Sequence, residues 1–262
     1  MKIAYGSDLH LELEIPRPDL APVRDADVLI LAGDIFKGRC KETGLPQLMK
    51  YSKACQRKLD IPVIVVCGNH ELYDEEVGQY LDECRAIADA TEGLYFLEND
   101  ALDIGGVRFL GCTLWSDFAM AEDAQVAKEA AQKIIYDYRR IKLANGSDEA
   151  RAISPDDTIR WNAASREFLS RSIAAESAPT VVVTHFPPVP MSDPKFADSP
   201  LTPYFNNDWA ADIEAGVLAP DIWVAGHTHY MEEQTIGRTR ICSRQGGYPG
   251  ELGPFSWGLV TL

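Results

Sequence analysis

Six short apolar runs recur along the chain, and they constrain its fold more than any other feature of the sequence. The runs span residues 3–6, 28–33, 63–68, 107–112, 181–184 and 222–226. Their apolar residues are continuous and do not alternate with polar ones, which is typical of strands buried on both faces of a sheet. Between the runs, residues 45–59 and 75–90 place apolar side chains near one helical face. This alternation of strand and helix predicts an α/β fold.

Residues 118–177 break the alternation, because they contain no strand-like run and are predicted to be mostly helical. Within them, Ser154 is followed by Pro155 and two acidic residues, which is a typical helix start. The chain has 262 residues, a length that suits one large domain. We therefore predict a single domain over residues 1–262 with a helical insertion at 118–177.

Five segments with potential metal ligands directly follow or end an apolar run. They are Asp8-Leu9-His10, Gly33-Asp34, Gly68-Asn69-His70, Thr184-His185 and Gly226-His227-Thr228-His229. The chain has only five histidines, and all of them lie in these segments. Ligands of open α/β sheets gather outside the carboxyl ends of the strands, so we expect these side chains to converge on one site.

Taken singly, most of these segments have a simpler interpretation. Asp8 and His10 could be a capping residue and a surface histidine, Gly33-Asp34 an ordinary turn, and His185 a structural histidine. The pair His227 and His229 is the most specific, because two imidazoles two residues apart can reach one metal cluster. Imidazole and carboxylate together suit divalent Mn, Fe and Zn. The combination predicts a metal site with the ligands Asp8, His10, Asp34, Asn69, His185, His227 and His229.

The charge and composition of the chain limit the classes of binding partner that we expect. The chain has 25 Lys and Arg against 40 Asp and Glu, a formal charge of −15. This charge repels polyanions, so we expect no long nucleic acid as the main partner. No apolar run is long enough to span a bilayer, and the sequence shows no signal peptide, so we expect a cytoplasmic protein without a membrane partner. The six cysteines form no C-x-x-C pair and are expected to be reduced thiols.

In their order and spacing, these segments resemble the calcineurin-like metallophosphoesterase superfamily, whose pattern is D-x-H, G-D, G-N-H, a lone H and G-H-x-H. The resemblance covers residues 8 to 229. It implies a four-layer αββα sandwich, in which two mixed β-sheets are stacked and flanked by helices. It also implies two divalent metal ions, Mn first, with Fe, Zn, Ni or Co as alternatives.

The resemblance implies a role for each matching residue. One metal would be held by Asp8, His10 and His229, and the other by Asn69, His185 and His227. Asp34 would bridge both metals, and His70 would lie beside them as a general acid without binding either. A hydroxide bound to the two metals would attack the phosphorus of a small-molecule phosphoester.

One departure from the superfamily pattern limits the classes of substrate that we expect. The Ser/Thr protein phosphatases usually contain G-D-x-V-D-R-G, but here residues 33–38 are Gly-Asp-Ile-Phe-Lys-Gly. The second Asp and the Arg are missing, which argues against a protein phosphatase and leaves His70 without its usual acidic partner. We expect a phosphodiesterase before a phosphomonoesterase, because no basic cluster for a monoester is visible. Several residues after the motifs are candidates for a pocket lining, although solvent exposure or packing is the simpler interpretation of each: Lys37, Arg39, Tyr73, Trp115, Asp117, Phe186 and Tyr204.

Two alternatives remain open at the level of the sequence. A nuclease acting on short nucleic acids would show salt-sensitive binding to oligonucleotides. A non-catalytic scaffold or interaction module on the same fold would not need His70.

Overall fold

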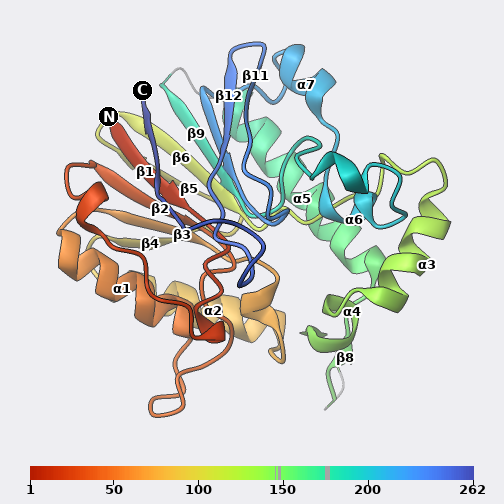
Figure 1. Ribbon diagram of the computed structural model, residues 1–262, viewed down its shortest axis with the longest axis horizontal. Coiled ribbons are helices and arrows are strands. Elements are labelled where there is room, and N and C mark those ends of the chain that lie inside the picture. Colours follow the sequence, from red (N-terminus) through yellow and green to blue (C-terminus); the bar gives the residue numbers. More distant parts are fainter. Residues whose placement is uncertain (145, 147–148, 175–177) are drawn as a thin grey trace.

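The six apolar runs all form strands, three in each of two β-sheets. The computed structural model describes residues 1–144, 146, 149–174 and 178–262. The two sheets lie face to face, and helices cover their outer faces (Figure 1). The predicted αββα sandwich is therefore confirmed.

The first sheet has five strands in the order β13-β1-β2-β3-β4. Its parallel strands are β1 (Lys2–Gly6), β2 (Val28–Ala32), β3 (Val63–Val66) and β4 (Leu94–Phe96). The last strand of the chain, β13 (Gly258–Thr261), pairs antiparallel with β1. Helices α1 (Gln47–Leu59) and α2 (Val77–Asp89) cover the outer face of this sheet (Figure 1).

The second sheet has six strands in the order β11-β12-β10-β9-β6-β5. Its four central strands are parallel: β6 (Val107–Cys112), β9 (Thr180–Thr184), β10 (Ile222–Ala225) and β12 (Thr239–Ser243). The edge strands β5 (Asp100–Ile104) and β11 (Glu233–Ile236) pair antiparallel with their neighbours. Both sheets are thus mixed.

Alternate residues of each central strand pack on opposite sides of its sheet. On β1, Ile3 and Tyr5 belong to the apolar cluster between the sheets, which also contains Val181 and Val183 of β9. Ala4 belongs instead to the larger cluster that includes the helices. Because both faces are covered, nearly every position of these strands is apolar, and this explains the continuous runs in the sequence.

The predicted insertion is mostly helical but contains one strand pair that the sequence analysis missed. Its helices are α3 (Ala124–Ile134), α4 (Asp137–Arg140) and α5 (Pro155–Ala174). Between α4 and α5, β7 (Lys142–Leu143) pairs antiparallel with β8 (Arg151–Ala152). The expectation of no strand in this region was wrong, because two-residue strands are too short to give an apolar run.

The helix start at Ser154 lies where the sequence placed it. The backbone N–H of Ser154 donates to Asp157 at 2.8 Å, and α5 begins at Pro155.

All six cysteines are buried and unpaired. Among the residues that the structure describes, no helix has the length and hydropathy needed to cross a membrane.

Candidate metal centre

The carboxyl ends of five parallel strands carry the predicted ligands to one place. Asp8 and His10 follow β1, Asp34 follows β2, and Asn69 and His70 follow β3, all in the first sheet. From the second sheet, His185 follows β9, while His227 and His229 follow β10. The backbone N–H groups of Asp8 and His10 donate to the carbonyls of Gly33 and Asp34, both at 3.0 Å, which aligns the ends of β1 and β2.

The backbone at these strand ends has an uncommon conformation. A positive φ is rare for residues other than glycine and costs free energy. It occurs at twelve of the described non-glycine residues, and five of these are predicted ligands: Asp8 (54°), His10 (42°), Asp34 (51°), His227 (75°) and His229 (50°). Non-glycine residues in such conformations cluster at functional sites.

Two glycines allow the close approach of the carboxylates. A Cβ at Gly68 would lie 2.1 Å from Oδ1 of Asp34, and a Cβ at Gly226 would lie 2.6 Å from Oδ2 of Asp8. Both distances are too short for any side chain, so each carboxylate occupies the space that a side chain would need.

We call Asp8, His10 and His229 the first ligand group, because their potential ligand atoms lie within 4.8 Å of one another. Nε2 of His10 and Nε2 of His229 are 3.0 Å apart, and Oδ1 of Asp8 is 3.5 Å from Nε2 of His229. The other imidazole nitrogens face carboxylates: Nδ1 of His10 is 3.3 Å from Glu12, and Nδ1 of His229 is 2.6 Å from Glu251.

The hydrogen bonds of the first ligand group fit a bound cation. A carboxylate only accepts hydrogen bonds, so Nδ1 of each histidine carries the proton and donates to its glutamate. Nε2 of each histidine is then the nitrogen that remains to bind a cation. At 3.0 Å the two Nε2 atoms are held together by a proton or by a metal cation between them. Burial would lower the pKa of His229, but Asp8 and Glu251 outweigh burial and raise it to about 9, so these carboxylates stabilise positive charge at this point. Carboxylate-held histidines of this kind are the usual metal ligands in proteins.

We call Asp34, Asn69, His185 and His227 the second ligand group. Nδ1 of His185 donates to the carbonyl of Ala32 at 2.9 Å, so its Nε2 is the nitrogen that faces Oδ1 of Asn69 (3.2 Å) and Oδ2 of Asp34 (3.4 Å). Nε2 of His227 is buried without any hydrogen-bond partner among the described residues. Two oxygens and two imidazole nitrogens thus converge here, one of the nitrogens without a partner among the described residues, and this donor set fits a bound cation.

The carboxylate of Asp34 belongs to the second group but also faces the first, and it is nearly inaccessible to solvent. Its Oδ2 is 3.4 Å from Nε2 of His185 in the second group and 3.9 Å from Nε2 of His10 in the first. Burial alone would lower the pKa of His185, but the charges of Asp34 and Asp8 outweigh burial and raise it to about 10. This position suits the bridging role that the sequence predicted for Asp34.

His70 lies beside the two groups and is only partly buried. It stacks on Tyr73 with ring centroids 4.4 Å apart, and its Nε2 is 3.1 Å from the hydroxyl of Tyr248 and 4.0 Å from Oδ2 of Asp34. Its Nδ1 is 3.8 Å from Oε1 of Glu12. Glu12 thus faces His70 from the side where the usual acidic partner of this histidine is missing from the motif.

Four of the residues around the ligands were not singled out in the sequence analysis. They are Glu12, Glu71, Tyr248 and Glu251. Glu71 is fully buried and accepts the backbone N–H groups of Gly68, Asp34, Ile35 and Phe36 at 2.7–3.0 Å. Burial and the charge of Asp34 raise the pKa of Glu71 to about 7. Its place directly after Gly68-Asn69-His70 was the one signal that could have pointed to it.

The candidate pocket residues have different environments. Tyr73, Trp115, Phe186 and Tyr204 are buried. Arg39 pairs with Glu75 and Glu83, and Lys37 with Asp74 at 3.4 Å. Of this set, Phe186 lies against a predicted ligand, with its ring centroid 3.8 Å from that of His227.

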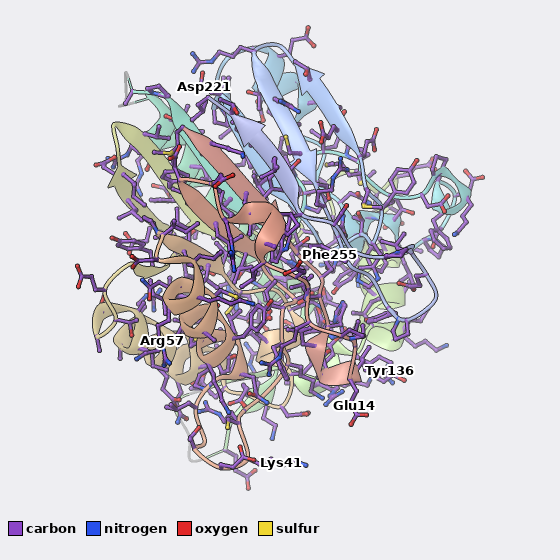
Figure 2. All side chains as sticks on the ribbon, turned by 60° about the vertical axis from the view of Figure 1, so that its left-hand side comes forward. Glu14, Lys41, Arg57, Tyr136, Asp221 and Phe255 are labelled. Atoms are coloured by element: carbon purple, nitrogen blue, oxygen red, sulfur yellow. The ribbon has the colours of Figure 1, made fainter. Side chains whose placement is uncertain are left out.

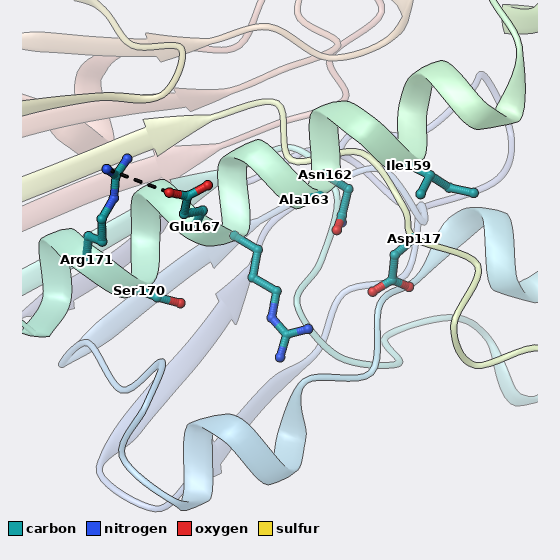
Figure 3. A pocket seen from close by; sticks show the side chains of 8 residues that line it. Asp117, Ile159, Asn162, Ala163, Glu167, Ser170 and Arg171 are labelled. Atoms are coloured by element: carbon teal, nitrogen blue, oxygen red, sulfur yellow. Dashed lines mark ion pairs between the residues drawn. The ribbon is translucent and has the colours of Figure 1, made fainter.

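A separate depression of about 490 Å³ lies along α5 and contains none of the predicted ligands (Figure 3). Its charged side chains have protein partners. Arg171 pairs with Glu167 at 3.7 Å, as the dashed line in Figure 3 shows, and Arg166 pairs with Asp212 outside the depression. Asp117, a candidate from the sequence, lines this depression and not the ligand groups.

The arrangement of the site therefore defines a class: an α/β sandwich that presents two adjacent sets of candidate metal ligands. Comparison with known proteins gives the same class, because residues 1–231 match the calcineurin-like phosphoesterase family. The chain belongs to this family, whose members typically use a dinuclear metal centre.

Individual relatives are distant. The uncharacterized protein L509 of Acanthamoeba polyphaga mimivirus is 24% identical in an alignment of 207 residues that covers 74% of this chain and 71% of that protein. Among solved structures, phosphopantetheinyl hydrolase from Mycobacterium tuberculosis has a TM-score of 0.66 at 20% identity, covering 95% of this chain and 90% of that one. TT1561 of Thermus thermophilus has a TM-score of 0.50 at 13% identity, covering 93% and 88%. At these identities the solved structures support the fold alone.

Proposed function

We propose that this chain is a dinuclear metallophosphoesterase that hydrolyses small phosphoester substrates, as one domain with residues 118–177 inserted. In this proposal the first ligand group holds one divalent metal, the second holds the other, and Asp34 contacts both. Manganese is the first candidate, and Fe, Zn, Ni and Co are compatible with the same ligands.

One observation carries the proposal. In both ligand groups, imidazole nitrogens and carboxylate or amide oxygens converge with their ligand atoms facing one another, and Nε2 of His227 has no partner among the described residues. The clearest case is the pair of Nε2 atoms of His10 and His229, 3.0 Å apart with both Nδ1 atoms committed to carboxylates. A scaffold that had lost its metals would have no reason to keep this arrangement.

When bound, two divalent cations supply an activated water near neutral pH and neutralise charge that develops on the phosphoryl oxygens. The protein supplies the rest. Glu71 fixes the loops that carry Asp34 and Asn69 through their backbone N–H groups. His70 has one nitrogen towards Asp34 and Tyr248 and the other towards Glu12, which suits the donation of a proton to a leaving oxygen.

For the substrate, we propose a small phosphodiester before a monoester. The formal charge of −15 disfavours long polyanions. In the described residues beside the site, Lys37 is paired with Asp74, so it offers a monoester dianion little free charge. The similar structure named phosphopantetheinyl hydrolase makes a phosphopantetheinyl compound a reasonable substrate to include in a panel.

The test is hydrolysis of bis-p-nitrophenyl phosphate and of p-nitrophenyl phosphate by metal-stripped protein to which Mn²⁺ is returned. We expect Mn-dependent turnover, faster with the diester, that Asp34→Ala abolishes and the loop variant Asp193→Ala leaves intact. Faster turnover of the monoester would reverse the preference for diesters. The absence of turnover and of metal binding with Mn, Fe, Zn and Co would contradict the proposal and favour the scaffold alternative.

A further inference from the structure

One carboxylate close to the second ligand group comes from the insertion. Asp137 is the first residue of α4 and is fully buried, whereas the preceding Tyr136 is 62% exposed near the edge of the molecule (Figure 2). Oδ1 of Asp137 accepts the amide N–H of Asn69 at 3.0 Å and the hydroxyl of Tyr73 at 2.8 Å. Its Oδ2 accepts the hydroxyl of Tyr204.

These contacts determine which end of the Asn69 amide faces the candidate metal. An asparagine amide has a donor end, Nδ2, and an acceptor end, Oδ1, and only the acceptor can bind a cation. A carboxylate cannot donate, so Asp137 selects Nδ2 and leaves Oδ1 pointing at Nε2 of His185, 3.2 Å away. Without this contact the amide could rotate and present Nδ2 to the metal position.

Asp137 is also a buried carboxylate without an ion-pair partner among the described residues. Burying a carboxylate is unfavourable unless it is paired or well hydrogen-bonded. Within the described part of the chain, no Lys, Arg or His lies within ion-pairing distance of Asp137, and its donors are an amide and two phenols. A cation bound by Asn69 would add a compensating charge, reached through the polarised amide, to that of His70, which already lowers the pKa that burial raises in Asp137.

We propose that Asp137 is a positioning residue for the second metal: it fixes the Asn69 amide with its oxygen towards the cation, so that the insertion completes the metal centre. This inference rests on the proposed dinuclear function. It gives residues 118–177 a direct role in metal binding, whereas a purely structural role would only tie α4 to the sheets.

The test is titration of metal-free protein with Mn²⁺, followed by EPR of free and bound metal, for wild type and Asp137→Asn. The asparagine keeps the shape of Asp137 but no longer selects one end of the Asn69 amide. We expect wild type to bind two Mn²⁺ per chain, and the variant to bind one with unchanged affinity and the other about 10–100-fold more weakly, the usual cost of losing an outer partner of a metal ligand.

Two further variants separate positioning from general destabilisation. Asp157→Asn removes another buried carboxylate of the insertion, which contacts Arg151 and Ser154 and no ligand, so it should keep both Mn²⁺ affinities. Asn69→Ala should weaken the same Mn²⁺ as Asp137→Asn, and the double variant should be no weaker than Asn69→Ala alone, because Asp137 acts through Asn69.

The outcomes distinguish the inference from the function on which it rests. If wild type binds two Mn²⁺ and Asp137→Asn binds both equally well, the positioning role is wrong and the dinuclear function stands. If wild type does not bind two metals, the proposed function itself is wrong. Should Asp137→Asn fail to fold, Tyr204→Phe removes one donor from the same carboxylate and should weaken the same Mn²⁺ by a smaller factor.

Discussion

The two ligand groups lie side by side around Asp34, but their ligands are held in different ways. In the first group, His10 and His229 are oriented by Glu12 and Glu251, from segments near the surface; the side chain of Glu251 is 45% exposed. In the second group, a backbone carbonyl orients His185, and the buried Asp137 orients Asn69. The first group is thus held by side chains that water can reach, and the second by the interior. We expect the first metal to exchange more readily than the second.

The largest effect should come from a substitution that disrupts both ligand groups at once, so that neither binds its metal. In Gly68→Ala the new Cβ would lie 2.1 Å from Oδ1 of Asp34, the residue that we propose contacts both metals. We expect loss of both Mn²⁺ ions and of turnover, together with about 1–3 kcal/mol of stability from overpacking. Metal titration and thermal unfolding measure the two effects.

Gly253→Ala is the matched control, because a Cβ there meets nothing within 4 Å. It should retain both metals. A Gly68→Ala protein that keeps one Mn²⁺ at full affinity would show that the groups do not depend on Asp34 equally.

The next largest effect should be a loss of turnover rate in a variant that keeps both ligand groups intact. His70→Ala removes the side chain beside Asp34 but no predicted ligand, so both Mn²⁺ affinities should remain while kcat falls about 10²–10⁴-fold, the range for a general acid. Steady-state kinetics and metal titration on one preparation check this. Unchanged kcat would assign the proton to another group, and a lost metal would place His70 among the ligands.

A smaller effect should separate the groups from each other. Glu251→Gln and Glu12→Gln each remove the carboxylate that orients a histidine of the first group, so each should weaken only that Mn²⁺, by about 10–100-fold. Glu12 also faces His70, 3.8 Å away, so its variant should lower kcat at saturating Mn²⁺, whereas Glu251→Gln should not. Release of Mn²⁺ to a chelator should be biphasic in wild type and faster only in the first phase for both variants; acceleration of both phases would mean that the groups are held together.

The smallest effect should lie away from both groups and report only on the insertion. Burial would raise the pKa of the Asp157 carboxyl, but hydrogen bonds from Arg151 and Ser154 outweigh burial and hold that pKa well below its usual range. A carboxyl whose pKa is lower in the folded state adds stability above the unfolded pKa and loses it as the pH falls through the folded value. Asp157→Asn should therefore lower Tm by a few degrees at pH 7 and by less near pH 2, measured by thermal unfolding. An equal fall in Tm at both pH values would contradict a charge-based contribution.

Much of this molecule could be predicted from its sequence, for a physical reason. Strands covered on both faces leave continuous apolar runs, and ligands at strand ends lie next to those runs, so β1 and Asp8 or β10 and His227 are visible together. The short or exposed strands were missed: β5 begins with an exposed Asp, and β7 has two residues. Neither can produce a continuous apolar run.

The residues that orient the ligands could not be predicted in the same way. Glu251 contacts His229 from a glycine- and proline-rich loop, and Asp137 contacts Asn69 from 68 residues away. Such contacts depend on where loops and helices pack in three dimensions. Glu12 is only two residues from His10, but an acidic residue beside a motif is common, and its second contact, with His70, exists only in the fold.

The positive φ angles at Asp8, His10, Asp34, His227 and His229 have a consequence for evolution and engineering. Each is a conformation that the chain would avoid if stability alone were selected. Selection for heat resistance, carried out without a requirement for metal, would favour glycine or asparagine at these positions. It would thereby replace predicted ligands of the candidate metal centre. At these five of the twelve described non-glycine residues with positive φ, a gain in stability would therefore remove a predicted ligand.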